Sequence, residues 1–148
     1  MQAPGHILET ALYAGDLDAA ERFYGDLLGL EKVTRMGDRH VFFRCGRGMV
    51  LIFNPDESVK PAQNPAMPVP VHGTRGNGHM CFGATAQELD SIADALTAAG
   101  VAIEADFHWP GGGRSIYVRD PAGNSIEFAE PRIWGFGTET GGKIETTD

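Results

Sequence analysis

The first half of the chain has a pattern of apolar and polar positions that predicts one strand, one helix and three more strands. Residues 7–13 read as a strand, and apolar residues then recur at helical spacing from Leu17 to Leu28. Asp16 stands at the expected N-cap of this helix, and Gly29 stands at its expected end. Strand-like runs bounded by turn residues follow at about 31–36, 40–45 and 49–54.

The second half repeats this plan. A strand is expected at 78–84, Thr85-Ala86-Gln87-Glu88 fits a capping box, and an apolar helical stripe runs to Gly100. The two helix-ending glycines are 71 residues apart, and Glu9 and His79 in the leading strands are 70 apart. Because the strands and the helix stops repeat at offsets that differ by only one residue, we expect two βαβββ modules. The last three strands of the second module are expected at about 101–107, 114–119 and 124–129.

The predicted fold class is therefore α+β, in a single domain of residues 1–148. Five of the nine prolines lie between the modules. Because proline removes backbone donors, we expect a linker or surface loop there, with His72 exposed. The tail has no apolar period, and its end at Gly141-Gly142-Lys143 is expected to be mobile. The expected boundaries are about 6–54 for module one, 55–77 for the linker, about 78–130 for module two and 131–148 for the tail.

The charge of the chain argues against two classes of partner. The 148 residues carry a formal net charge of −8, whereas nucleic acids and anionic membranes reward clustered Lys and Arg. No apolar run approaches the roughly 20 residues that a bilayer span needs, and the first residues lack the features of a secretory signal. With only two cysteines, Cys45 and Cys81, the expected compartment is the reducing cytoplasm.

Three predicted strands carry a polar residue where an apolar residue would be less costly. By strand alternation, Glu9, His79 and Glu127 lie on faces with small neighbours, opposite the bulky faces expected to pack under the helices. A carboxylate without a partner in such a place is costly, and a divalent cation is one way to offset that cost. Taken singly, a strand Glu is more often solvated or paired with Arg, and a strand His is more often hydrogen-bonded in the core. The equivalent positions of Glu9 and His79 in the two modules favour the metal interpretation.

Three motifs carry a resemblance to a known family. They are Asp16-Leu17 leading to Arg22-Phe23-Tyr24-Gly25-Asp26-Leu27-Leu28-Gly29-Leu30, Gly78-His79-Met80-Cys81-Phe82, and Asp120-Pro121-Ala122-Gly123-Asn124-Ser125-Ile126-Glu127-Phe128. Over about residues 6–130 the chain resembles the vicinal oxygen chelate superfamily, which includes glyoxalase I, fosfomycin-resistance thiol transferases, methylmalonyl-CoA epimerase, extradiol dioxygenases and bleomycin-resistance proteins. The resemblance implies an open, cupped, barrel-like mixed sheet with the helices outside, a metal held by Glu9, His79 and Glu127, and a homodimer.

The chain departs from several branches of this family. Alignment puts Val50 at the position of the fourth ligand of glyoxalase I, and valine cannot ligate a metal. Extradiol dioxygenases hold Fe(II) with two His and one Glu, and Glu9 breaks that triad. Ala11 and Phe107 replace two phosphonate-binding residues of the fosfomycin enzymes, although Ser115 and Tyr117 fit that pattern. Bleomycin-binding members lack the metal triad that this chain retains in modified form.

The expected function is that of a metal-dependent enzyme with lyase or isomerase chemistry on a small vicinal-oxygen substrate. One divalent ion (Mn, Zn, Ni, Mg or Fe(II)) would be the cofactor. The resemblance to isomerase and glyoxalase-like members of the family, in which a glutamate beside the metal moves protons, implies Glu127 or Glu9 as the catalytic base. Tyr117, Ser115 and Arg114 are expected to bind substrate, although a plain hairpin turn is the favoured interpretation of the run Gly111-Gly112-Gly113-Arg114. The alternative is a metal-free protein that binds or sequesters a drug or metabolite. An Fe(II) extradiol dioxygenase is the third and less favoured interpretation.

Overall fold

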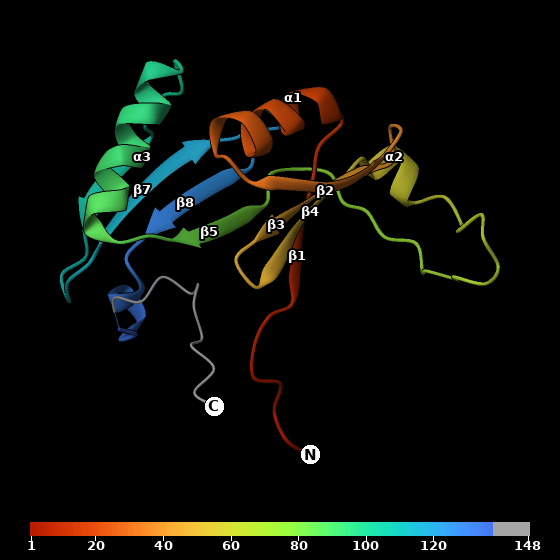
Figure 1. Ribbon diagram of the computed structural model, residues 1–148, viewed down its shortest axis with the longest axis horizontal. Coiled ribbons are helices and arrows are strands. Elements are labelled where there is room, and N and C mark those ends of the chain that lie inside the picture. The colour runs from red at the N-terminus through yellow and green to blue at the C-terminus, as the bar shows by residue number, and fades with distance from the viewer. Residues whose placement is uncertain (138–148) are drawn as a thin grey trace. The chain divides into compact units, whose positions relative to one another are not determined.

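Two four-stranded mixed sheets organise the chain (Figure 1). In the computed structural model, which describes residues 1–137, each sheet belongs to one compact unit. The first unit contains Met1–Gly78 together with the turn Asp120–Asn124, and the second contains His79–Arg119 and residues 125–137. The predicted α+β class with two βαβββ modules is confirmed, and neither sheet is closed. The tail beyond residue 137, with Gly141-Gly142-Lys143, lies outside the described residues.

The first sheet has the strand order β1-β4-β3-β2. Its outer strand β1 runs parallel to β4, and the other neighbours are antiparallel. The strands predicted at 31–36 and 40–45 have those bounds in the structure. The elements of this unit are β1 (Glu9–Tyr13), α1 (Leu17–Glu21), the π-helical turn η1 (Arg22–Leu27), β2 (Glu31–Met36), β3 (His40–Cys45), β4 (Gly48–Phe53) and α2 (Pro55–Ser58).

The second sheet repeats this topology in the order β5-β8-β7-β6, with β5 parallel to β8. The predicted capping box is present, because Thr85 accepts from the N–H of Glu88 and the Glu88 carboxylate accepts from the N–H of Thr85. The strand expected from residue 101 begins only at Ala105, since the N–H of Val101 still closes the helix end on Leu96 O. The elements are β5 (His79–Gly83), α3 (Ala86–Ala98), β6 (Ala105–His108), β7 (Arg114–Arg119), β8 (Ser125–Ala129) and the 3₁₀ turn η2 (Pro131–Trp134).

Both predicted helix stops are confirmed by their backbone. Gly29 and Gly100 have φ of +74° and +77°, a region that L side chains avoid. The first helix differs from the prediction in its pitch. From Arg22 it continues as a π-helix, and the N–H of Leu28 bonds to the carbonyl of Phe23, five residues earlier. The apolar stripe is kept, so this helix still covers its sheet.

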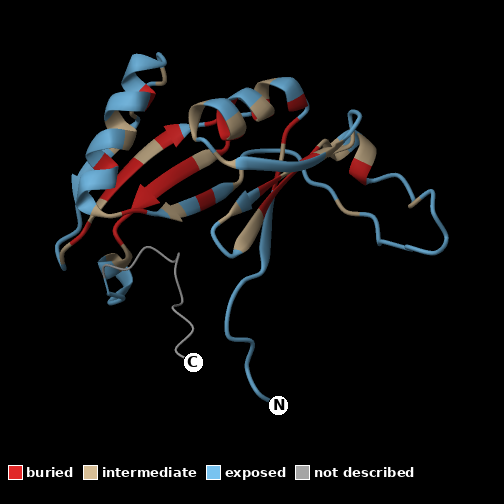
Figure 2. Cartoon of the chain, viewed as in Figure 1, coloured by how far each residue is buried: buried red, intermediate tan, exposed pale blue. Residues whose placement is uncertain are grey.

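Each helix covers one face of its own sheet. The core of each unit lies between that helix and that sheet. In the first unit Tyr24 contacts Phe43, and in the second Leu89 and Leu96 are buried beneath α3. Figure 2 shows buried residues concentrated on the strands, with a continuous buried run on β8 from Ile126 to Ala129. The strand residues that face the helices include Val41, Phe43, Val50, Ile52, Ile116, Val118, Ile126 and Phe128.

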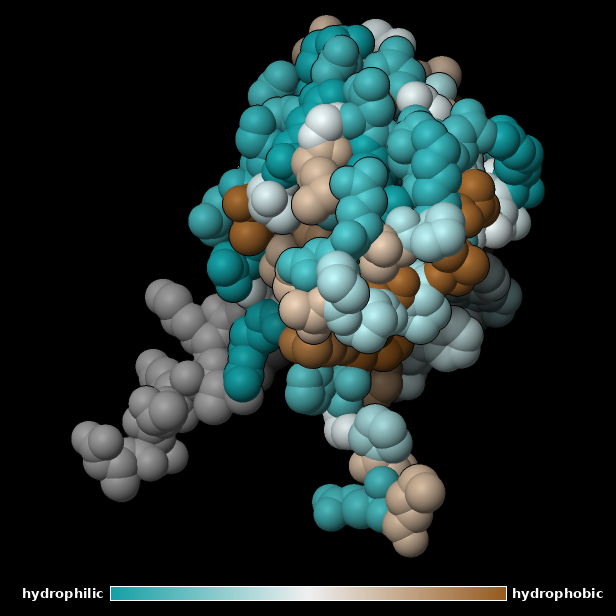
Figure 3. All heavy atoms as spheres, turned by 90° about the vertical axis from the view of Figure 1, so that its right-hand side faces the viewer, coloured by the Kyte–Doolittle hydropathy of each residue, from teal (hydrophilic) through white to brown (hydrophobic). Residues whose placement is uncertain are grey.

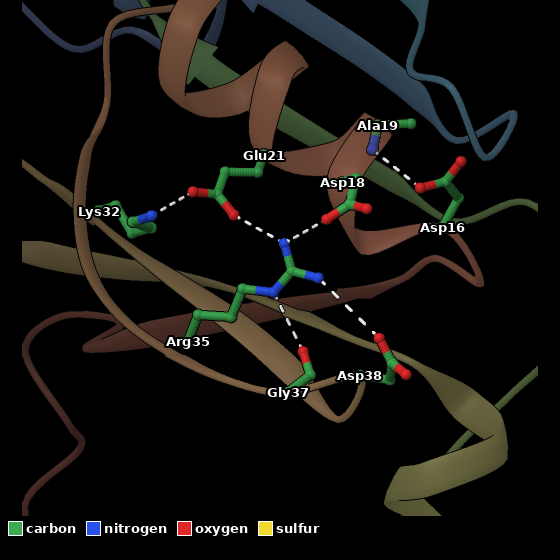
Figure 4. A network of polar contacts seen from close by, with 8 residues as sticks. All are labelled: Asp16, Asp18, Ala19, Glu21, Lys32, Arg35, Gly37 and Asp38. Atoms are coloured by element: carbon green, nitrogen blue, oxygen red, sulfur yellow. Dashed lines mark hydrogen bonds and ion pairs between the residues drawn. The ribbon is translucent and has the colours of Figure 1, made fainter.

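Charged side chains fasten α1 to the edge strand β2 (Figure 4). The guanidinium of Arg35 donates to Asp18 at 2.6 Å and to Glu21 at 2.9 Å, and its Nε donates to the carbonyl of Gly37. Lys32 pairs with the other oxygen of Glu21. Lys32, and then Arg35, hold the pKa of the Glu21 carboxyl below its usual value.

The proline-rich linker contains more structure than the sequence indicates. Its start forms α2, because Asn54 accepts from the N–H of Asp56 and Pro55 is well suited to the first helical position. The expectation that His72 is exposed is wrong. Its Nδ1 lies 2.7 Å from the Tyr13 hydroxyl, and its ring meets Phe53 edge-on.

On the face shown in Figure 3, hydrophobic side chains form small groups among hydrophilic ones.

Candidate functional site

The face of the second sheet that points away from α3 carries most of the predicted site residues. Glu127 on β8 pairs in register with Cys81 on β5 and with Tyr117 on β7, so these three side chains form one row across the sheet. Ser115 and His79 lie on the same face in the neighbouring rows. Glu127 and Ser115 are buried, whereas His79 is half exposed. The sheet therefore brings His79, Ser115, Tyr117 and Glu127 together.

His79 and Glu127 face each other through a ring nitrogen and a carboxylate oxygen. When the imidazole is neutral, both of these atoms are hydrogen-bond acceptors. His79 Nδ1 lies 3.0 Å from the carbonyl oxygen of Ser125, which can only accept, so Nδ1 carries the proton. The other nitrogen, Nε2, lies 3.3 Å from Glu127 Oε2. Two lone pairs at that distance repel unless a second proton or a cation lies with them. This arrangement can be satisfied by an imidazolium ion or by a metal ion.

The His79–Glu127 separation fits two ligands of one metal ion. Nitrogen and oxygen ligands bind ions such as Zn²⁺ at about 2.0–2.2 Å, so two adjacent ligands of one ion are about 3.0–3.4 Å apart. A backbone carbonyl that fixes the far nitrogen of the histidine is also the usual support of a histidine ligand. Among residues 1–137, however, no three His, Cys, Asp or Glu side chains already form a cluster that could hold an ion. The second unit therefore supplies a pair of ligands and not a complete set.

Glu9, the third predicted ligand, lies in the first unit. It begins β1 opposite Met49 of β4, and its residue is exposed. In the part of the chain that the structure describes, its carboxylate makes no hydrogen bond or ion pair. Its role as a ligand or base remains a prediction.

The register identifies the residue of the first module that corresponds to Glu127. In β5 and β8, Cys81 pairs with Glu127, and in β1 and β4 the equivalent pair is Ala11 with Leu51. The sequence alignment placed Val50 at the position of a fourth ligand, but Val50 pairs with Phe43 on the helix-covered face. The position belongs to Leu51, since adjacent strand residues point to opposite faces. Leucine, like valine, cannot ligate a metal.

Tyr117 and Ser115 have defined relations to the Glu127 carboxylate. Ser115 Oγ donates to Glu127 Oε1 at 2.6 Å. Burial, and then the neighbouring Glu127 carboxylate, raise the pKa of Tyr117 to about 12, so its phenol is protonated at neutral pH. The Tyr117 ring stacks between His79, at 6.2 Å, and Phe107, at 6.0 Å between centroids.

Arg114 lies elsewhere. It precedes Ser115 in β7 and therefore points to the face that α3 covers. Its guanidinium binds both oxygens of Asp106 and also Asp90 of α3, and these carboxylates raise its pKa. Because this side chain is committed to two carboxylates on the opposite face from Glu127, we do not include it in the candidate site.

Trp109 is a site residue that the sequence did not single out. Its indole Nε1 donates to Ser115 Oγ at 2.8 Å. The available signal was its place six residues before Ser115, across the glycine-rich turn that joins β6 to β7.

The two paired modules, each with a four-stranded mixed sheet, define the class of the fold as α+β with a repeated βαβββ unit. The family model described as "Glyoxalase/Bleomycin resistance protein/Dioxygenase superfamily" matches residues 5–128. The chain belongs to this family.

Three solved structures illustrate the likeness. The chain is 48% identical to lactoylglutathione lyase from Agrobacterium tumefaciens, over 91% of this chain and 100% of that chain, with a TM-score of 0.86. A glyoxalase/dioxygenase from Nostoc punctiforme is 23% identical over 87% and 94% of the two chains, with a TM-score of 0.63. A glyoxalase/bleomycin resistance protein/dioxygenase from Nocardioides is 19% identical over 97% and 92%, with a TM-score of 0.67. The last two show the fold alone. No helix within residues 1–137 is long and apolar enough to cross a membrane.

Proposed function

We propose that the protein is a metal-dependent enzyme of glyoxalase type, with lyase or isomerase chemistry on a small substrate that carries two vicinal oxygens. The observation that carries the proposal is the 3.3 Å separation of His79 Nε2 and Glu127 Oε2, which is the spacing that two adjacent ligands of one metal ion have. Family membership and the 48% identity to a lactoylglutathione lyase support it.

The proposed ligands are Glu9, His79 and Glu127. Two carboxylates and one imidazole suit Mn(II), Mg(II), Zn(II), Ni(II) or Fe(II), and three protein ligands leave room for two substrate oxygens. When bound, the ion supplies Lewis-acid stabilisation of the negative charge that develops on a substrate oxygen.

The protein side chains would divide the remaining work. Glu127 is held by Ser115, so it is suited to a fixed ligand position. Glu9 makes no hydrogen bond or ion pair within residues 1–137, so its carboxylate is the one free to take a proton from the substrate and return it. Tyr117, protonated at neutral pH because its pKa is about 12, can donate a hydrogen bond to a substrate oxygen.

Lactoylglutathione is the first substrate to test, because a relative with 48% identity is named for it. The reaction to follow is the interconversion of lactoylglutathione with glutathione and the three-carbon oxoaldehyde. Because Leu51 cannot act as a fourth ligand, this chain has three candidate metal ligands. Other 2-oxygenated carbonyl compounds therefore belong in the same panel of test substrates.

Metal analysis tests the proposal directly. The protein, purified without added chelator, should hold about one divalent ion per chain. His79→Ala and Glu127→Gln should each lose most of this metal. The matched controls are His108→Ala, on the opposite face of the second sheet, and Glu104→Gln, which pairs with Arg119 on the surface. Both controls should keep it.

Two results would contradict the metal site. One is the absence of metal from the parent protein, even after dialysis against Mn, Zn, Ni and Fe(II). The other is equal metal in the parent, His79→Ala and Glu127→Gln. Either result would leave a metal-free protein that binds a small molecule as the better account.

The homodimer expected from the resemblance is part of the proposal. Light scattering on a sizing column should give twice the chain mass of 15.9 kDa, and a monomer at micromolar concentration would contradict it.

A further inference from the structure

A serine hydroxyl links the proposed metal ligand Glu127 to a tryptophan. Ser115 is fully buried, accepts from Trp109 Nε1 at 2.8 Å and donates to Glu127 Oε1 at 2.6 Å. The chemistry of the three groups determines which atom donates in each of these two hydrogen bonds. An indole N–H can only donate, so Ser115 Oγ must accept from it, and the single serine proton is left for the carboxylate. A chain of two such bonds is also stronger than two separate bonds, since each polarises the next.

The indole at the start of this relay is fixed from two sides. The backbone of Trp109 bonds to Gly113 and Gly112 across the β6–β7 turn. Its ring meets Phe107 edge-on at 4.9 Å between centroids. Phe107 in turn pairs in register with Ser115, which places the tryptophan beside the serine. Trp109 is therefore held in a position from which its N–H reaches the hydroxyl.

The two oxygens of Glu127 have separate partners. Ser115 donates to Oε1, and Oε2 faces His79 Nε2 at 3.3 Å. Tyr117 and Cys81 also interact with this carboxylate, so the Ser115 bond is one of several contacts that orient it. With the bond in place, one oxygen is anchored and the other is presented with the histidine.

We propose that Ser115 and Trp109 are positioning residues that orient the Glu127 carboxylate for metal binding, and that the turn carrying Trp109 is thereby coupled to the metal site. This inference rests on the proposed function, because it requires Glu127 to be a metal ligand. Outer partners of metal ligands of this kind commonly change metal affinity by about 10–100-fold when they are removed.

Trp109 also provides the readout. The chain has two tryptophans, so Trp134→Phe leaves Trp109 as the single indole. In that background, addition of Zn²⁺ or Mn²⁺ should change the emission of Trp109, and the change should saturate with the affinity measured by calorimetry. Ser115→Ala should abolish the emission change at metal concentrations that saturate the parent.

Calorimetric titration with the same metals measures the positioning effect without an activity assay. Ser115→Ala should weaken binding about 10–100-fold and Trp109→Phe about tenfold. Trp109→Phe keeps a ring against Phe107 but removes the N–H, and the control Trp134→Phe makes the same change at an exposed site. Ser115→Thr, which keeps the hydroxyl, should bind within a few-fold of the parent.

The outcomes separate the two claims. If the parent binds metal and both Ser115→Ala and Trp109→Phe bind it equally well, the positioning role is wrong while the metal site stands. If the parent binds no metal, the proposed function fails and the positioning role fails with it. Because Trp109 is partly exposed and Trp109→Phe is conservative, this variant decides the question even if Ser115→Ala does not fold.

Discussion

Tyr24 donates its phenolic proton to Asp120 at 2.7 Å, although 96 residues separate them in the chain. Tyr24 belongs to the first helix motif of the family resemblance, and Asp120 opens the Asp-Pro-Ala-Gly-Asn turn. Asn124, at the end of that turn, accepts from the N–H of Gly78 and donates to the carbonyl of Tyr13. These bonds explain why the turn between β7 and β8 belongs to the first compact unit. The two motifs are thus parts of one buried polar network.

Replacing Tyr24 with Phe should destabilise the first unit. The change removes a hydrogen bond to a charged, buried carboxylate, and such bonds contribute about 1.5–3 kcal/mol. The loss should be about that size in urea unfolding. A double-mutant cycle with Asp120→Asn should show coupling between the two sites. A loss below about 0.5 kcal/mol would contradict the importance of the bond.

Tyr24 should also make the free energy of unfolding sensitive to alkaline pH. Burial, and then Asp120, raise the pKa of Tyr24 above its usual 10.0. Above pH 10 the unfolded chain loses this proton while the folded chain keeps it, so the free energy of unfolding falls as the pH rises. Tyr24→Phe should show a shallower fall between pH 10 and 11. Parallel curves for the two proteins would show that Tyr24 does not cause it.

The Arg35 network should contribute modestly and in a pH-dependent way (Figure 4). Arg35→Gln should lower the free energy of unfolding by about 0.5–1 kcal/mol at pH 7, because its partners are partly exposed. Since the pKa of Glu21 is lowered in the fold, its stabilisation is present above its unfolded value of 4.5 and is lost as the pH falls below that value. The difference between parent and variant should therefore shrink toward pH 3. Arg47→Gln, at an exposed arginine with no ion pair within residues 1–137, is the control.

Substitutions of the two proposed carboxylate ligands, Glu9 and Glu127, should differ in their effects on kcat and on metal content. Glu9→Gln removes the candidate base but keeps an oxygen that can ligate, so kcat should fall by about 10²–10⁴-fold while most of the metal is retained. Glu127→Gln should lose more metal than Glu9→Gln, because Glu127 is one of the two proposed ligands that the second sheet already brings together. Metal content and kcat, measured on the same samples with lactoylglutathione or the best substrate found, check this. Equal metal loss in both variants would assign Glu9 a purely ligating role.

The strands, helix stops and repeated topology could be predicted because they depend on local pattern. Period-two alternation placed Glu127 and His79 on one face, and the structure agrees. The same rule could have excluded Arg114, since it is adjacent to Ser115 and must point to the opposite face. The ion pairs of Arg114 with Asp90 and Asp106 join three elements, and no local pattern indicates them.

Other features depend on tertiary contacts that a pattern does not encode. The π-helical turn at Arg22–Leu27 keeps the same apolar spacing as an α-helix, so the sequence does not distinguish them. His72 lies in a linker whose composition indicates solvent, and only its contact with Tyr13 and Phe53 orders it. Trp109 reaches Ser115 only because the β6–β7 turn brings them together.

The β6–β7 turn should be the most sensitive point for testing how the fold supports the site. Gly113 has a φ of +91°, and a Cβ there would lie 2.5 Å from Ile133 Cγ2 and 3.3 Å from the backbone nitrogen of Ile133. Gly113→Ala should therefore cost about 1–3 kcal/mol of stability. Gly111, two residues earlier, has an ordinary φ and open space, so Gly111→Ala is a matched control and should change stability by less than about 0.5 kcal/mol.

Because Trp109 bonds to the carbonyl of Gly113, the shift forced by Gly113→Ala should also reach the Ser115 hydroxyl. Urea unfolding, together with the emission of Trp109 in the Trp134→Phe background, measures both effects on one protein. A destabilised Gly113→Ala protein with unchanged Trp109 emission would mean that the turn tolerates the strain without moving the indole. Equal stability of the Gly111 and Gly113 variants would contradict the packing of the turn against Ile133. A blue or red shift of the Trp109 emission maximum in Gly113→Ala, but not in Gly111→Ala, would show that the strain lies in the turn that holds Trp109 beside Ser115.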